Sequence, residues 1–299
     1  MRNEIYQQIT DRIISKLEQG VIPWQKPWHS SGLAPRNIKG RPYRGINPLL
    51  LDCENYKSPF WLTFNQAKDL GGNIKKGEKS TMIVFWKMMH KTSTEEVDGE
   101  IKIDHKKFPY LRYYRVFNLE QTENIPLDKI PTVETTPEID FSPIEKAEQI
   151  IAAWDDKPQI KHGGSRAFYR PMFDQVNMPE PKHFISKEHY YSVLFHEYVH
   201  ATGHETRTAR HKSLPNHSFG SRDYSIEELV AEMGAAFLCG ITGVENDATA
   251  EMNAAYVQSW IGALKNDNRL LLKAASLAQK ACDYIAPPDF EEKEESAAA

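Results

Sequence analysis

The 299-residue sequence is poor in cysteine, with only Cys53, Cys239 and Cys282, which lie far apart. An odd and scattered set of thiols supports neither a disulfide framework nor a Cys-x-x-Cys metal site, and it fits a reducing compartment. The sequence also lacks any uninterrupted apolar run of about 18 residues, the length that a transmembrane helix needs. Its first residues lack the apolar stretch of a signal peptide. We therefore expect a cytoplasmic protein that makes no membrane contact.

Charge of neither sign dominates the whole chain, because 37 lysines and arginines stand against 41 aspartates and glutamates. The two parts of the sequence differ, however. Residues 1–125 carry 20 basic and 14 acidic side chains, a balance of +6, whereas residues 126–299 carry 17 and 27, a balance of −10. Only the first part is therefore suited to a polyanion, although a balance of +6 is also common on an ordinary solvated surface.

The first part of the sequence predicts a small α+β domain in residues 1–125. Apolar residues at helical spacing predict a helix at about residues 3–18. Residues 80–88 and 110–118 are rich in β-branched and aromatic residues, which predicts a pair of strands. The polar stretch between them, residues 91–107, predicts a long hairpin loop.

The second part predicts a mainly helical domain in residues 142–286 with a small β-sheet, so the predicted fold class is α+β with two domains. Residues 126–141 are rich in proline, threonine and glutamate and indicate a linker. The acidic tail, residues 287–299, is expected to be disordered. We expect further helices at about residues 186–202, 226–239, 250–265 and 268–285.

The motif His-Glu-x-x-His stands at His196, Glu197 and His200, within the predicted helix of residues 186–202. Residues four apart on an α-helix share one face, so both imidazoles can bind one metal ion with Glu197 beside it. Two ordinary histidines are the alternative. Apolar neighbours such as Leu194 and Val199 indicate a buried helix, in which unpaired imidazoles would be costly, so we favour metal binding.

A catalytic zinc ion takes three protein ligands, so a third must be found. Glu228 and Glu232 lie one turn apart, which allows one to bind the metal and the other to orient a ligating histidine. We favour Glu228 as the ligand and Glu232 as the orienting group, because their spacing resembles the Glu-x-x-Ala-Asp helix of zincins. Ser225-x-x-Glu228 also fits a capping box, which would give Glu228 a purely structural role.

Tyr224 precedes this helix on the connection that follows the motif, and we predict that it is a catalytic group that stabilises the transition state. Three histidines on the same connection are weaker candidates: His204, His211 and His217. With Glu197 as the general base, the predicted reaction is peptide-bond hydrolysis. Zn²⁺ is the expected cofactor, and two histidines with a carboxylate would also accept Mn²⁺.

Aromatic and basic residues are interleaved in the first part, a mixture that can stack bases and follow phosphates. Trp24 and Trp28 lie on a proline-broken segment and are predicted to be exposed, whereas Trp86 within an apolar strand is more readily explained as core. The predicted DNA-binding residues are Trp24, Lys26, Trp28, Arg41, Tyr43, Arg44, Lys75, Lys76 and Lys79.

The sequence resembles the ArdC-type antirestriction proteins of conjugative plasmids, whose N-terminal domain is shared with TraC-type primases. The resemblance rests on runs in both parts of the chain, including residues 23–28 (PWQKPW), 43–47 (YRGIN), 84–87 (VFWK), 196–204 (HEYVHATGH) and 227–238 (EELVAEMGAAFL). It implies a single-stranded-DNA-binding domain followed by a zincin-like metallopeptidase domain. It further implies that the protein protects incoming plasmid DNA from host restriction during conjugation.

Two other functions fit the same residues. The protein could be a DNA-binding antirestriction module whose metal site is structural and not proteolytic. It could also be a processing protease whose first domain binds protein. Single-stranded DNA is the expected partner in the favoured interpretation, and host restriction-modification proteins or another protein are the candidate substrates.

Overall fold

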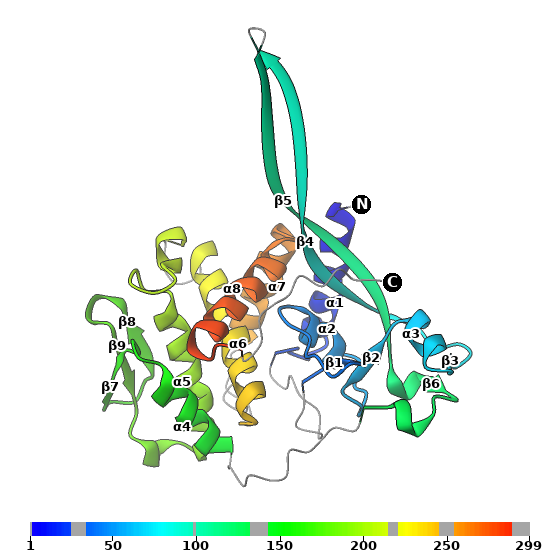
Figure 1. Cartoon of the computed structure of the whole chain (residues 1–299). Coiled ribbons are helices and arrows are strands. Elements are labelled where there is room, and N and C mark those ends of the chain that lie inside the picture. The colour runs from blue at the N-terminus through cyan, green and yellow to red at the C-terminus, as the bar shows by residue number, and fades with distance from the viewer. Residues whose placement is uncertain are drawn as a thin grey trace.

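The computed structural model describes residues 2–24, 34–97, 100–131, 143–214, 221–244 and 254–288. Figure 1 shows two parts side by side, one from the chain before residue 131 and one from the chain after residue 143. Each part combines helices with small sheets, so the predicted α+β class is confirmed. Residues 132–141 of the predicted linker and residues 289–299 of the predicted tail lie outside the described residues.

The first part begins with α1 (Arg2–Glu18) and continues with short helices, several short strands and two long ones, β4 and β5. In chain order these are β1 (Arg36–Asn37), α2 (Asn47–Asp52), β2 (Phe60–Leu62), α3 (Phe64–Asp69), β3 (Asn73–Ile74), β4 (Thr81–Val97), β5 (Glu100–Asn118), η1 (Leu119–Gln121), β6 (Thr122–Glu123) and η2 (Leu127–Lys129). The main sheet has the order β1-β2-β5-β4, with β1 and β2 parallel and the other pairs antiparallel. β3 and β6 form a separate antiparallel pair.

β4 and β5 form a long hairpin that projects from the body of the protein (Figure 1). Their pairing runs without interruption from Thr81 opposite Val116 to Val97 opposite Glu100. The prediction of a loop over residues 91–107 is therefore wrong. Strand pairing joins backbone groups and does not require apolar side chains, so the ladder of the apolar strands continues through the polar stretch.

The second part combines a three-stranded sheet with longer helices. In chain order its elements are α4 (Pro143–Ala153), β7 (Gln159–His162), β8 (Phe168–Arg170), η3 (Pro171–Phe173), β9 (Gln175–Met178), η4 (Pro181–His183), α5 (Lys187–Thr202), η5 (Arg210–Ser213), α6 (Arg222–Thr242), α7 (Ala254–Asn266) and α8 (Leu270–Ile285). The sheet order is β7-β9-β8, in which β9 is parallel to β7 and antiparallel to β8. Among the described residues, no helix is both long and apolar enough to cross a membrane.

α6 begins at Arg222, four residues before the predicted start. Its N-cap is Ser221, whose side chain accepts a hydrogen bond from the backbone N–H of Tyr224. Ser225 lies inside the helix and donates its hydroxyl to the carbonyl of Ser221. The capping-box alternative for Ser225 and Glu228 is therefore wrong, and the Glu228 carboxylate has no role as a cap.

The two parts share a hydrophobic core. α1 packs along α7, and the ring of Trp24 meets that of Trp260 edge-on at 5.3 Å between centroids. The hydroxyl of Thr10 donates to the carbonyl of Asn268 over 2.9 Å. The apolar face of α1 is therefore completed by helices from the far end of the chain.

Candidate metal centre and nucleic-acid surface

The central feature of the site is the face of α5 that carries His196 and His200 one turn apart. Ser186 caps this helix at its N-terminus, since its side chain accepts from the backbone N–H of His189. α6 lies against the same face and approaches closely at Gly234, where a Cβ atom would lie 2.7 Å from Val199 Cγ2. The absence of a side chain at Gly234 therefore allows α6 to present its carboxylates to the two histidines.

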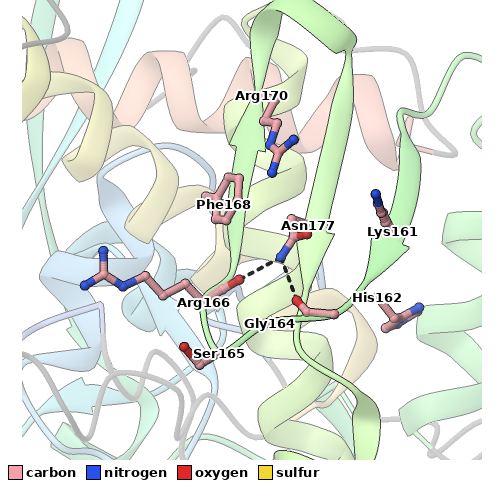
Figure 2. Close-up of a pocket in the computed structure, with 9 residues that line it drawn as sticks. Lys161, His162, Gly164, Ser165, Arg166, Phe168, Arg170 and Asn177 are labelled. Carbon is pink, nitrogen blue, oxygen red and sulfur yellow. Dashed lines mark hydrogen bonds between the residues drawn. The ribbon is translucent and has the colours of Figure 1, made fainter.

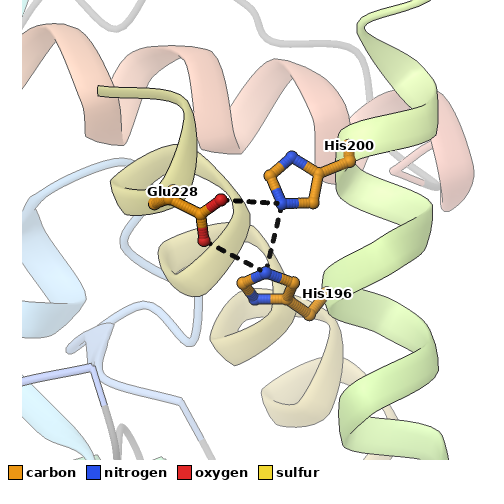
Figure 3. A group of neighbouring side chains, drawn as sticks. All are labelled: His196, His200 and Glu228. Atoms are coloured by element: carbon orange, nitrogen blue, oxygen red, sulfur yellow. Dashed lines mark hydrogen bonds and ion pairs between the residues drawn. The ribbon is translucent and has the colours of Figure 1, made fainter. Parts of the chain in front are cut away.

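His196, His200 and Glu228 point toward one another across the α5–α6 contact, as Figure 3 shows. The Nε2 atoms of the two histidines are 3.1 Å apart. One Glu228 carboxylate oxygen lies 3.6 Å from His196 Nε2, and the other lies 3.7 Å from His200 Nε2. A tetrahedral zinc ion bound at about 2.0–2.2 Å would separate its ligand atoms by about 3.3–3.6 Å. The observed separations lie within about 0.2 Å of this range, so one divalent cation fits between the three donors after small side-chain shifts.

Carboxylates surround the two imidazoles. Glu197 is buried, and Glu232 Oε1 lies 3.4 Å from the Nδ1 atom of His196. Burial lowers the pKa of His196, but the hydrogen bond to Glu228 and the charges of Glu232 and Glu197 outweigh it and raise the pKa to about 10. Burial raises the pKa of Glu232 to about 7. The strong negative potential that protonates His196 is also one that attracts a divalent cation.

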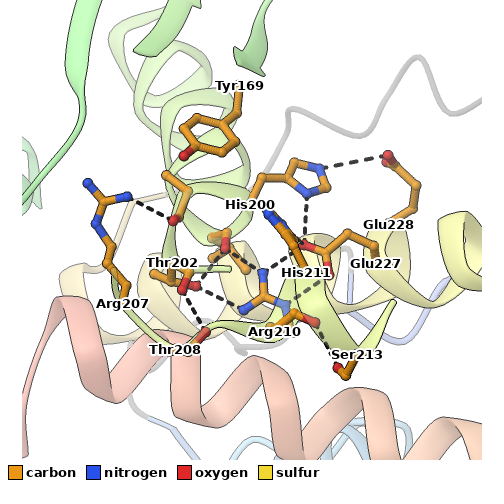
Figure 4. Close-up of polar contacts among 12 residues, drawn as sticks. Tyr169, His200, Thr202, Arg207, Thr208, Arg210, His211, Ser213, Glu227 and Glu228 are labelled. Atoms are coloured by element: carbon orange, nitrogen blue, oxygen red, sulfur yellow. Dashed lines mark hydrogen bonds and ion pairs between the residues drawn. The ribbon is translucent and has the colours of Figure 1, made fainter. Parts of the chain in front are cut away.

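Glu227, which is not among the predicted site residues, contacts the ring of His200 (Figure 4). Its Oε1 atom lies 3.1 Å from His200 Nδ1. The Arg210 guanidinium donates to both carboxylate oxygens, over 2.7 and 2.8 Å. Burial raises the pKa of Glu227, but these hydrogen bonds hold it well below its usual value. The sequence hints at the role of Glu227 only through its position next to Glu228. Its partner Arg210 lies 17 residues earlier, so no local pattern links the two side chains.

His211 belongs to the same network, because its Nε2 atom lies 3.3 Å from Glu227 Oε1. Its ring needs the space left by Gly203, where an added Cβ would lie 2.3 Å from Nε2. His204 instead contacts the hydroxyl of Thr206 at 2.8 Å on an exposed turn. His217 lies outside the described residues.

Tyr224 lies in the first turn of α6, so the prediction that it lies on the connection before this helix is wrong. Burial raises the pKa of Glu228, but hydrogen bonds from His196 and from the Tyr224 side chain contribute to a net lowering. Tyr224 therefore contacts the same carboxylate that closes the metal-binding triangle, one helical turn before it.

Several predicted DNA-binding residues have other roles or lie elsewhere. Trp24 is fully buried against Trp260, so the prediction that it is exposed and stacks a base is wrong. Arg44 forms an ion pair with Asp283 of α8, so its charge is neutralised within the protein. Two of the predicted residues lie outside the described part of the chain: Lys26 and Trp28.

The basic residues that precede β4 remain accessible. Lys75, Lys76 and Lys79 are exposed, and Lys75 Nζ also donates to the carbonyl of Glu120 over 2.7 Å. Trp86, which the sequence analysis placed in the core, is 48% exposed. Trp86 pairs with Leu111 of β5, and its ring centroid is 6.4 Å from that of Tyr6 in α1.

An aromatic row lies at the base of the hairpin, formed by Tyr43, Phe85 and Tyr114. The centroid of Phe85 is 6.4 Å from that of Tyr43 and 5.6 Å from that of Tyr114. Tyr114, Arg112 and Tyr110 alternate along β5 and so share one face of the strand. The Arg112 guanidinium lies 5.9 Å from the Tyr110 ring. This face of β5 combines aromatic rings with the positive charge of Arg112. Arg41, which is half-buried, lies two residues before Tyr43 of the aromatic row.

Comparisons with known proteins agree with this architecture. Residues 3–117 match the N-terminal domain of anti-restriction factor ArdC, and residues 145–277 match a zincin-like metallopeptidase domain. The metal-free crystal structure of antirestriction protein ArdC from the R388 plasmid is similar to this chain with 37% sequence identity and a TM-score of 0.73, over 94% of this chain and 96% of that one. The chain belongs to the ArdC antirestriction family.

Other relatives support the same assignment. The Mn(II)-bound structure of R388 ArdC has 36% identity and a TM-score of 0.70, again over 94% of this chain and 96% of that one. The uncharacterised protein y4eC of Sinorhizobium fredii is 34% identical over 94% of this chain and 91% of its own length. DNA primase TraC of Escherichia coli is 35% identical over 98% of this chain, which spans only 28% of the primase. The resemblance to ArdC-type proteins is thus confirmed.

Proposed function

We propose that this chain binds single-stranded DNA with its first part, hydrolyses a peptide bond at a metal centre in its second part, and thereby protects incoming plasmid DNA from host restriction during conjugation. The triangle of His196, His200 and Glu228 carries the proposal, because its donor separations suit one tetrahedral ion. The Mn(II)-bound relative supports a divalent cation. Zn²⁺ is the ion that we propose, with Mn²⁺ as a substitute.

When bound, a divalent cation supplies Lewis acidity, which polarises a peptide carbonyl and makes water more acidic. His196, His200 and Glu228 would hold the ion. Glu197 is the general base, which takes a proton from the attacking water and passes it to the leaving amine. The carboxylates at the Nδ1 atoms of the two histidines, Glu232 and Glu227, fix the ring orientations and keep both Nε2 atoms directed at the centre.

Tyr224 is proposed to donate a hydrogen bond to the oxygen that gains charge during hydrolysis. Its present partner is Glu228, so it is already held at the edge of the triangle. Replacement of Tyr224 by Phe is expected to lower the rate of hydrolysis while the metal content stays the same. Loss of the metal from this variant would instead assign Tyr224 to positioning Glu228.

The aromatic row of Tyr43, Phe85 and Tyr114 packs partly against the core. Tyr110 on the same face of β5 is 38% exposed, and this ring supports the DNA-binding half of the proposal because an exposed ring can stack on a base. Arg112 and the exposed lysines that precede β4 provide charge for phosphates. Affinity for oligothymidylate, measured by fluorescence anisotropy, should fall when Arg112 is replaced by Ala, and the affinity of the wild type should fall as salt is added. A salt-independent affinity would favour a first domain that binds protein.

The decisive experiment is plasmid transfer into recipients with and without a restriction system. Glu197→Gln should retain its metal, as measured by mass spectrometry, but should lose protection in restricting recipients only. Glu205→Gln is the matched control, because Glu205 is an exposed carboxylate on the turn after α5. Full protection by Glu197→Gln would show that hydrolysis is not required, and the metal site would then be structural.

The protein substrate is tested separately. We propose host restriction-modification proteins as candidates, acting in the cytoplasm of the recipient. Purified restriction enzyme incubated with the metal-loaded wild type should yield new fragments, and the Glu197→Gln protein should yield none. Fragments from both proteins would contradict the role given to Glu197.

A further inference from the structure

A cavity of about 420 Å³ lies over the β7-β9-β8 sheet and is unrelated to the metal-binding triangle. Lys161, Asn177 and Phe168 are register partners on the three strands, so they share one face of the sheet. The opposite face carries Val176, which belongs to the core, and its register partners Ile160 and Tyr169, which pack against the core. The cavity thus opens on the side of the sheet that is turned away from the core (Figure 2).

The walls of this cavity are positively charged. Its lining includes Lys161, Arg166 and Arg170, all exposed, and no carboxylate. No carboxylate of the described residues forms an ion pair with any of these three cations. Because residues 126–299 have a balance of −10, a cluster of basic residues without acidic partners is unusual in this part of the chain. The local field favours an anion.

The loop along one side of the cavity, residues 163–166, is held in place by a buried side chain. The Asn177 amide donates to the carbonyls of Gly163 and Arg166, each over 3.0 Å, and Asn177 is only 8% exposed. Gly163 and Gly164 have φ angles of +147° and +71°, which disfavour residues with a side chain. A Cβ atom at either glycine would meet nothing within 4 Å. The backbone of a fixed loop is therefore open to close approach by a ligand.

Phe168 and Arg170 add a planar surface to the charged walls. They lie two residues apart on β8, and the Arg170 guanidinium lies 4.9 Å from the Phe168 ring. Tyr169 between them points the other way, with its ring 6.3 Å from that of His211 beside the metal centre. The cavity and the metal centre therefore lie on opposite sides of the same strand.

We propose that this cavity is a second binding site, which takes a phosphate ester carried by a nucleotide. Lys161, Arg166 and Arg170 neutralise the phosphate, and the open backbone at Gly163 and Gly164 lets it approach closely. The volume is within the range of about 300–1,000 Å³ that holds small-molecule ligands, which is larger than a bare phosphate ion needs. The phosphate ester has two possible sources, a free mononucleotide or the backbone of a DNA strand.

Titration calorimetry on the full chain tests the site, with thymidine monophosphate as the free-nucleotide probe and oligothymidylate as the strand probe. Thymidine monophosphate should bind at one site per chain, and thymidine, which lacks the phosphate, should not bind. The double variant Arg166→Ala, Arg170→Ala should weaken binding by at least about tenfold. The charge-matched control replaces Lys182 and Lys187, exposed residues of the same part that do not line the cavity, and should stay within about twofold of the wild type.

The two probes distinguish the sources of the phosphate. Dependence of thymidine monophosphate binding on Arg166 and Arg170 supports a free nucleotide, whereas dependence of oligothymidylate affinity alone supports a strand. If neither affinity differs between the wild type and the double variant, the proposal is overturned. Both arginines are exposed, so the variant should fold, and thermal melting checks this. Lys161→Ala provides a second variant with the same expected direction.

Discussion

Replacement of Arg210 by Met would remove the charge that balances Glu227 behind the metal centre. Arg210 and Glu227 are both buried, and their side chains form two hydrogen bonds to each other. The guanidinium also donates to Thr202 Oγ1 over 3.0 Å and to the carbonyl of Val199 over 2.7 Å. Removal of one partner from a buried ion pair costs about 3–5 kcal/mol, because the other charge is left uncompensated. We expect the free energy of unfolding to fall by this amount at pH 7.

The pH dependence of this loss follows from the pKa of Glu227. Its folded-state pKa lies well below the usual value, so the pair contributes stability above the unfolded pKa, and this contribution is lost as pH falls through the folded pKa. The difference between the wild type and Arg210→Met should therefore be largest at neutral pH and shrink in acid. Urea unfolding of metal-free protein at several pH values measures it.

A double-mutant cycle with Glu227→Met isolates the pair itself. The double variant buries no charge at this position, so its loss of stability should be smaller than the sum of the two single losses. A loss below about 1 kcal/mol for Arg210→Met, or strictly additive single losses, would refute the reasoning. Metal affinity is a second readout, since loss of a carboxylate that orients a ligating histidine typically weakens binding by about 10–100-fold.

Four further predictions concern packing and metal binding. Gly203→Ala should destabilise the protein by about 1–3 kcal/mol in urea unfolding, because its Cβ would overlap the His211 ring, whereas Gly262→Ala in α7, where a Cβ meets nothing, should be neutral or stabilising. Trp24→Ala should cost about 3–5 kcal/mol in the same assay and leave oligothymidylate affinity of the folded protein unchanged, since the ring is buried. Removal of the metal by a chelator should lower the melting temperature, and added Zn²⁺ or Mn²⁺ should restore it. Metal affinity measured by calorimetry should rise with pH, because metal-free His196 has a pKa of about 10 and must release its proton on binding.

The parts of the site that depend on local spacing could be predicted from the sequence. His196 and His200 share a helix face because they are four residues apart, and the same rule places Glu228 and Glu232 on one face of the next helix. The choice of Glu228 over Glu232 comes from the resemblance to the zincin helix and not from spacing. The start of that helix could not be predicted, since Ser221 and Ser225 are both good caps and only the folded chain selects the first.

Side-chain roles that depend on contacts between distant parts of the chain could not be predicted from the sequence. Glu227 acquires its role from Arg210, 17 residues earlier, and nothing local links the two side chains. Trp24 looks exposed on a proline-broken segment, yet Trp260 covers it. The length of the β4–β5 hairpin could not be predicted for another reason. Its pairing joins backbone groups, and the polar side chains of residues 91–107 give no indication of that pairing.

The contact between α1 and α7 has a consequence for biosynthesis. α1 is synthesised well before α7, which covers part of its apolar face, as the 258-residue separation of Thr10 and Asn268 illustrates. At about 5–20 residues per second, the nascent helix waits about 13–50 s for those partners. During that interval the isoleucines of α1 lack these partners, and the helix reaches its native packing only after the α7 residues and Asn268 have been synthesised.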